Sequence, residues 1–347
     1  MFQNVNRQSG PRPAFTLVEL LVVIAIIALL IGIAVPSISA ARSAAKKVAT
    51  LATIKGLGEG CEAFNGEFNR YPKSNDRGGN PFFAGNNATL SGAQWLTIQL
   101  SGPDFEGYVD WRDPKANARG TTQGIDHNDW QAWYGLDSTG EYRGLRVGPY
   151  VTADSSNTMT PERLLQEGTR AITLSESIAD ERDVPFLAKK LPYYQDRWNN
   201  PILYYAANVG SPLPFTPANG GGDPGGGGGE GGAFTVTDGV YDQSDNKQWT
   251  GGPGGVGINP NADEGTNLGG QFEHQIKEIG YSRGQQTRPN PDDPSFASFL
   301  YDRALFEQTL NGTKGKIRPY NPETFIMISA GEDRIFGTGD DVKNFNN

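Results

Sequence analysis

The sequence predicts an α+β fold: a long N-terminal helix whose second half packs on a small antiparallel sheet interrupted by large loop insertions. Three observations support this class. Residues 15–35 form an apolar run that contains a single charge. Apolar residues then recur three or four positions apart as far as residue 71, which is a helical spacing. A short apolar segment at residues 324–329 lies next to a stretch rich in glycine and predicts a buried strand.

Composition limits the classes of function. The chain of 347 residues has a formal net charge of −9, which repels phosphate backbones, so we expect no nucleic-acid partner. A single cysteine, Cys61, excludes an internal disulfide. The two histidines, His127 and His274, are too few for a His-based catalytic or metal site, and we expect both in ordinary loops or at the surface. With the acids scattered as well, the chain is not expected to be an enzyme.

Residues 15–35 are long enough to cross a membrane. As a helix, this segment covers about 30 Å, the thickness of a bilayer core. Its leucine, isoleucine and valine side chains offer about −4 to −8 kcal/mol of insertion free energy, against a cost of up to ~3 kcal/mol for Glu19. Arg7 and Arg12 precede the span, which predicts a cytoplasmic N-terminus, a single pass and an exported C-terminal domain. Basic residues on the other flank weaken this bias: Arg42, Lys46 and Lys47.

The apolar run differs from an ordinary secretory signal. Such a signal has a shorter apolar core that is followed closely by a small-residue cleavage site. Here the run is longer and no such pattern follows it, so we expect the apolar helix to remain in the mature protein.

The N-terminal sequence resembles a known family. Residues 14–24, AFTLVELLVVI, are similar to the cleavage and methylation segment of type IV prepilins and type II secretion pseudopilins. The resemblance implies that residues 1–14 are a leader, that a prepilin peptidase cuts between Ala14 and Phe15, and that it methylates the new amine. It also implies that Glu19 faces the Phe15 amine of a neighbouring subunit during assembly. Ala14 stands where the family usually has glycine, which predicts slower processing.

Residues 36–72 predict an amphipathic continuation of the helix. Cys61 lies on its apolar stripe and is expected to be a buried small hydrophobe. Glycines at 56, 58 and 60 predict a bend or partial unwinding, and Tyr71-Pro72 predicts the end of the helix. The stripe also contains these residues: Ile38, Ala41, Ala45, Val48, Leu51, Ile54, Leu57, Phe64 and Phe68.

Three further segments resemble the major pseudopilin of type II secretion: residues 63–72, 148–150 and 196–205. For the last of these, the resemblance implies a turn that is followed by a strand. The resemblance implies a pilin fold with a globular domain over residues 73–347 and insertions at about 73–147 and 206–320. Tryptophans in the first insertion predict a small additional core: Trp95, Trp111, Trp130 and Trp133. The second insertion contains a glycine run at residues 219–232, which predicts a flexible linker, and residues 294–310 predict a helix.

The C-terminal residues 330–341 are rich in carboxylates and glycines. From the residues alone, a solvated turn and a site for a hard cation such as calcium are equally consistent with this composition. The major pseudopilin ends in a similar stretch that binds calcium, and this resemblance implies Asp333, Asp340 and Asp341 as ligands with a structural role. Arg334 stands where that pattern usually has glycine.

The resemblance implies a structural subunit of a periplasmic pseudopilus for type II protein secretion, anchored by one pass in the bacterial inner membrane. Its partners would be other copies of itself, minor pseudopilins, the prepilin peptidase and the inner-membrane assembly platform. One alternative is a type IV pilin or minor pilin for adhesion, motility or DNA uptake. Another is a membrane-anchored enzyme or binding protein, which would need a polar pocket around residues 95–135 or 240–310.

Overall fold

The computed structural model describes the N-terminal helix, much of the globular core and the C-terminal loop. The described residues are 16–75, 90–109, 146–153, 157–160, 191–209, 240–250, 274, 276, 296–300 and 319–345. They belong to two compact units, residues 1–46 and 47–347, which share helix α1. The glycine run at 219–232 and three of the four tryptophans of the first predicted insertion lie outside the described residues.

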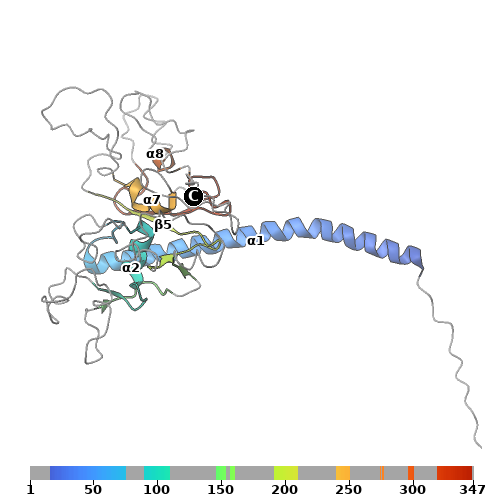
Figure 1. Cartoon of the computed structure of the whole chain (residues 1–347), viewed down its shortest axis with the longest axis horizontal. Helices are drawn as coiled ribbons and strands as arrows, with labels where there is room; N and C mark the ends of the chain where they lie inside the picture. Colours follow the sequence, from blue (N-terminus) through green and yellow to red (C-terminus); the bar gives the residue numbers. More distant parts are fainter. Residues whose placement is uncertain are drawn as a thin grey trace, which may run out of the picture. The chain divides into compact units, whose positions relative to one another are not determined.

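Helix α1 spans Leu17–Phe68 and is drawn in blue in Figure 1. It stays helical through its three central glycines, so the predicted unwinding there does not occur. Gly60 is required by packing, because a Cβ atom at this position would lie 2.3 Å from Cγ2 of Val151. The helix ends as predicted, with Asn69 in the left-handed region at φ 53° two residues before Tyr71-Pro72.

The predicted apolar stripe is buried only in the second half of α1. Ile54, Leu57, Cys61 and Phe64 lie in the core, which confirms the stripe and the burial of the cysteine. The prediction is wrong for Ile38, which is exposed, and for Val48, which is also exposed. The first buried side chain of α1 is that of Thr50, so the core of the second unit begins there.

The central sheet has three antiparallel strands in the order β5-β6-β7. Strand β5 is Leu203–Ala206, β6 is Phe325–Ser329 and β7 is Val342–Lys343. Leu203 pairs with Ile328, and Ser329 pairs with Val342. The two segments predicted as strands are thus neighbours, although more than a hundred residues separate them in sequence.

Both faces of this sheet are covered. Tyr204 and Met327 face the core that contains α1, whereas Tyr205 and Ile326 face a second core. The second core combines residues of the sheet and the C-terminal loop with residues between 206 and 320, among them Trp249 of helix α7 (Lys247–Thr250) and Phe296 and Leu300 of helix α8 (Phe296–Leu300). Strand β6 is therefore buried at every position.

Helix α2 (Gly92–Ser101) lies inside the first predicted insertion and is buried along its whole length. Trp95 packs in the same core as α1, so it does not build the additional core predicted for it. Ser91 caps the helix with Gln94 in a reciprocal capping box. The Gln94 Nε2 then donates to the carbonyl of Leu191 at 3.1 Å, which satisfies a buried amide.

Short elements complete the second unit. Strand β1 (Tyr108–Val109) pairs with β2 (Arg146–Val147), and β3 (Thr158–Met159) pairs with β4 (Tyr193–Tyr194), both antiparallel. A 3-10 helix, η4 (Gln243–Asn246), leads into α7. The α+β class predicted from the sequence is confirmed, and a long apolar helix followed by small antiparallel sheets is consistent with a pilin fold.

His274 lies outside any helix or strand, as expected, but it is not at the surface. It is fully buried and packs against Phe336, with ring centroids 5.2 Å apart. Its Nδ1 accepts a hydrogen bond of 3.1 Å from the backbone N–H of Phe336, which ties it to the C-terminal loop. This bond requires an unprotonated Nδ1.

Candidate functional site

The first candidate site is the start of α1. The predicted cleavage point between Ala14 and Phe15 lies outside the described residues, and Thr16 is the first residue described. Thr16 and Glu19 form a reciprocal cap. The backbone N–H and the hydroxyl of Thr16 donate to Glu19 Oε2 at 2.9 and 2.8 Å, and the Glu19 N–H donates to Thr16 Oγ1 at 3.2 Å. The carboxylate is therefore held at the first turn of the helix by Thr16, the residue that follows Phe15 in the sequence.

This cap was not recognised from the sequence, although the pattern Thr-x-x-Glu before an apolar run is its usual signal. The cap satisfies N–H groups that the helix itself leaves without acceptors. It also gives Glu19 partners within its own chain.

The helix that follows is apolar and exposed on every side. Its large side chains, from Leu17 to Val35, are all exposed in the single chain. By length and composition α1 qualifies as a membrane-crossing helix. It continues through Pro36, where the hydroxyl of Ser37 donates to the carbonyl of Ile33 at 3.1 Å. The apolar N-terminal helix indicates membrane anchoring.

The second candidate site joins α1, the turn before β5 and the C-terminal loop. Asp196 is buried at the centre of this turn. Its Oδ1 accepts the N–H groups of Trp198 and Asn200 at 2.7 and 2.8 Å, and its Oδ2 accepts the Ser329 hydroxyl at 2.6 Å. Burial raises the pKa of Asp196, and these hydrogen bonds only partly offset it.

The same turn contacts the helix and the loop. The N–H of Arg197 donates to Thr50 Oγ1 on α1 at 3.3 Å. Nδ2 of Asn200 donates both to Asp196 Oδ2 and to the carbonyl of Gly331, at 2.7 and 2.9 Å. The turn that resembles the pseudopilin sequence therefore fixes the loop relative to the second half of α1.

The three predicted calcium ligands all lie on the C-terminal loop, each with hydrogen-bond partners of its own. Asp340 Oδ2 accepts the N–H groups of Glu332 and Asp333 at 2.8 and 3.0 Å, and Asp340 Oδ1 accepts the Thr338 hydroxyl at 2.6 Å. Burial raises the pKa of Asp340, but these bonds outweigh it and leave that pKa lowered. Burial also raises the pKa of Asp333, whose Oδ1 accepts the N–H of Ile335 at 2.7 Å.

Asp341 differs from the other two carboxylates. It is buried, which raises its pKa, and its Oδ2 accepts the Gly337 N–H at 2.8 Å. No donor among the described residues reaches its Oδ1. Within the described part of the chain, no three acidic, histidine or cysteine side chains are arranged to hold a metal ion. A cation here would therefore depend on Asp341 and on backbone carbonyls.

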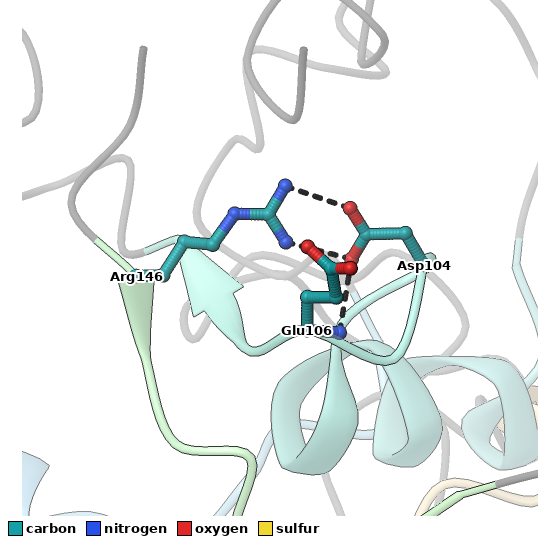
Figure 2. A network of polar contacts seen from close by, with 3 residues as sticks. All are labelled: Asp104, Glu106 and Arg146. Atoms are coloured by element: carbon teal, nitrogen blue, oxygen red, sulfur yellow. Dashed lines mark hydrogen bonds and ion pairs between the residues drawn. The ribbon is translucent and has the colours of Figure 1, made fainter. Parts of the chain in front are cut away.

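A separate ion pair stabilises the segment between α2 and β1. Figure 2 shows the guanidinium of Arg146 making two bonds to the carboxylate of Asp104, of 2.8 and 2.7 Å. Oδ1 of Asp104 also accepts the Glu106 N–H at 3.2 Å. This bidentate geometry links β2 to the turn before β1 and has a structural role.

Comparison with known proteins supports the N-terminal site. A family model described as the prokaryotic N-terminal methylation motif matches residues 12–35. None of the curated proteins and none of the solved structures compared with the chain matches it. The motif is carried by type IV pilin-like prepilins, which are structural subunits rather than enzymes. It implies processing by a prepilin peptidase and assembly with other pilin subunits, and it is common to pilins and pseudopilins.

Proposed function

We propose that this chain is a pseudopilin, a structural subunit that is processed by a prepilin peptidase and assembles into a periplasmic pseudopilus for type II protein secretion. The observation that carries the proposal is the contrast within α1. Its first half presents apolar side chains on all sides, whereas its second half is packed in the chain's own core. Such a surface is not stable in water and requires a covering layer.

The apolar first half of α1 would be covered in two ways, by lipid before assembly and by other subunits after it. Before assembly, the hydrocarbon core of the inner membrane would surround residues 17–35, with the leader in the cytoplasm and the globular unit in the periplasm. After assembly, the same helices from neighbouring copies would surround one another. The minor pseudopilins and the membrane assembly platform are the other expected partners.

Glu19 supports this account. A lone carboxylate in an apolar span is costly, and the expected partner is a positive charge. Its own chain supplies two donors from Thr16, and both are neutral. Cleavage before Phe15 would create a charged amine at the start of the same helix. In a bundle of such helices, the Phe15 amine of one copy would then pair with the Glu19 carboxylate of its neighbour.

A filament assay tests the role of Glu19. Glu19→Gln removes the charge but keeps the shape, so filament yield should fall sharply while membrane insertion is unchanged. Glu59→Gln is the matched control, because Glu59 is an exposed acid on the second half of α1. Electron microscopy of sheared filaments and membrane fractionation measure the two properties. Normal filaments from Glu19→Gln would overturn this assignment.

Secretion is favoured over a surface pilus by the pseudopilin-like segments at residues 148–150 and 196–205 and by the lone, buried Cys61, which leaves no pair for an internal disulfide. Deletion of the gene is expected to stop protein secretion and to leave surface pili intact. Loss of pili with normal secretion would favour the type IV pilin alternative.

We also propose that calcium stabilises the C-terminal loop, with Asp341 and backbone carbonyls as the first ligands and with Asp333 and Asp340 moving into the coordination sphere when the ion binds. The support is the resemblance together with the buried Oδ1 of Asp341, which lacks a donor among the described residues. Calcium at a hundred times its dissociation constant should add about 2.7 kcal/mol to the free energy of unfolding.

Asp341→Asn should abolish that gain, whereas the exposed Glu323→Gln should keep it. Thermal unfolding of the full chain in detergent, with calcium or with a chelator, measures both. Equal melting temperatures in the two conditions would contradict the calcium site.

A further inference from the structure

Strand β5, labelled in Figure 1, forms one edge of the central sheet, and among the described strands it pairs with β6 alone. The N–H of Ala207 donates to the carbonyl of Thr324, just before β6, at 2.9 Å. The backbone groups of Tyr204 and Ala206 therefore point the other way, out of the sheet. A row of such groups is a template for pairing with a strand of another molecule. What bonds to these groups decides whether copies of this chain can join through their sheets.

Two buried side chains bond to the outward groups of β5. The N–H of Ala206 donates to Ser74 Oγ at 3.0 Å, and the carbonyl of Tyr204 accepts Nδ2 of Asn246 at 2.8 Å. Ser74 and Asn246 are 2% and 0% exposed. The two bonds occupy a donor and an acceptor that an added strand would use.

Backbone bonds continue the same edge beyond both ends of β5. The N–H of Ile202 donates to the carbonyl of Tyr194 on β4 at 2.9 Å, and the N–H of Asn208 donates to the carbonyl of Val240 at 2.7 Å. The four alternate positions from 202 to 208 are therefore all bonded within the chain. Their partners come from three regions that are far apart in sequence, so the edge is covered by the folded chain as a whole.

The buried carboxylate of Asp245 holds Ser74 in place. Its Oδ2 accepts the Ser74 hydroxyl at 2.5 Å, and its Oδ1 accepts Nδ2 of Asn75 at 2.8 Å. Asn246 is held in a similar way, because its Oδ1 accepts the N–H of Ala93 on α2 at 3.1 Å. Each side chain on the edge thus has a second hydrogen bond that fixes its orientation. Ser74, Asp245 and Asn246 are called the edge lock below.

Helix α2 packs closely against this edge. A Cβ atom at Gly92, the first residue of α2, would collide with the carbonyl oxygen of Tyr204 and would lie 2.9 Å from Nδ2 of Asn246. This close approach leaves no space for a further strand beside β5 while α2 is in place. Strand β5 is then available only after local opening of the segments that cover it.

We propose that the edge lock closes β5 to strand addition and so keeps membrane-anchored copies of this chain from joining through their sheets. Anchoring confines the copies to one surface and raises their effective concentration, which favours such pairing. With the sheet edge closed, the exposed apolar half of α1 is left as the surface for assembly. The inference needs membrane anchoring alone and does not depend on which filament the chain builds. The alternative is that the same bonds only stabilise the fold.

Association of the full chain in lipid nanodiscs that hold one copy each separates these two roles. Ser74→Ala and Asn246→Ala each remove one bond to β5, whereas Ser74→Thr keeps the hydroxyl. Ile54→Ala is the matched control, because it weakens the core of the same unit without removing a bond to β5. Mild urea brings all the proteins to the same free energy of unfolding. Sedimentation velocity then measures association between discs, and hydrogen exchange of the Ala206 amide reports on the edge.

The two alanine variants should associate roughly tenfold more tightly than the natural protein, while Ser74→Thr and Ile54→Ala should not. In dilute samples of Ser74→Ala, the Ala206 amide should exchange several-fold faster, and association should slow it again, as strand pairing requires. Each alanine variant is decisive without the other. Equal association of Ile54→Ala would overturn the proposal, because loss of stability alone would then explain it. Alanine variants that remain single discs, or that associate without protection of the Ala206 amide, would also overturn it.

Discussion

The two halves of helix α1 differ in apolar content and lie in opposite environments: the first is apolar on every side and exposed, and the second is amphipathic and packed in the core. In the first half, Ile24 is 56% exposed. In the second half, Ile54 is 1% exposed and packs against residues of the α2 helix and the central sheet. The second half therefore stabilises the fold of its own chain. The first half contributes nothing to that core, so its sequence is explained by what surrounds it in a membrane or an assembly.

The largest expected effect contrasts these two isoleucines. Ile54→Ala should lower the free energy of unfolding of the globular unit by about 2–5 kcal/mol, because it leaves a cavity in a closed core. Ile24→Ala, the same change in the same helix, should alter it by no more than about 0.5 kcal/mol. Denaturant unfolding of both proteins in detergent micelles measures the difference. Equal losses would show that the first half also belongs to a core.

Alanine substitutions at two glycines in the second half of α1 should change the free energy of unfolding in opposite directions. At Gly60 a new Cβ atom would collide with Val151, so Gly60→Ala should destabilise the unit by about 1–3 kcal/mol. Gly56 has nothing within 4 Å of such an atom, and Gly56→Ala should stabilise it by about 1 kcal/mol through helix propensity. Thermal unfolding compares the two. A gain from both substitutions would disprove the close contact between α1 and Val151.

The turn at residues 196–200, which connects α1 to the C-terminal loop, should make the free energy of unfolding of the globular unit depend on pH. Burial raises the pKa of Asp196 above its unfolded value of about 3.9. Its contribution is then fully present below that value and is lost as the pH rises through the folded pKa. The stability difference between the natural protein and Asp196→Asn should change by up to about 1.4 kcal/mol per pH unit in this window. A difference that is constant from pH 4 upward would contradict a buried Asp196.

The smallest expected effect is at the start of the first half. Thr16→Ala removes the cap of α1 and should cost the first turn about 1 kcal/mol, whereas Thr16→Ser should keep the cap. Hydrogen exchange of the amides of residues 17–20 should accelerate about fivefold in the alanine variant. The unfolding of the globular unit should be unchanged in both variants.

Local signals in the sequence predicted much of this fold. The apolar run and the later stripe predicted α1, and Tyr71-Pro72 predicted its end. The first four residues of β6, Phe325 to Ile328, form an unbroken apolar run, which also indicates a strand covered on both faces. The stripe failed at Val48, because periodicity shows which side of a helix is apolar and does not show where the partner surface begins.

Long-range contacts explain what could not be predicted. Helix α2 has buried glutamines, and Gln94 finds its acceptor at Leu191, ninety-seven positions away. Nδ2 of Asn246 donates to the carbonyl of Tyr204 at 2.8 Å and so joins the segment before α7 to β5. Neither contact has a local sequence signal. At the first candidate site, the cap between Thr16 and Glu19 has a local sequence signal, Thr-x-x-Glu before an apolar run. At the second, the burial of Asp341 depends on how the loop folds and has no local signal.

The most direct test is the N-terminus of the protein purified from membranes of cells that contain a prepilin peptidase and of cells that lack it. Mass spectrometry and N-terminal sequencing identify the first residue. We predict a methylated Phe15 start in the first case and an uncleaved chain in the second. A Met1 start in cells with the peptidase, or a cut beyond Val35 that removes the apolar helix, would contradict the account of this chain as a processed pilin-like subunit.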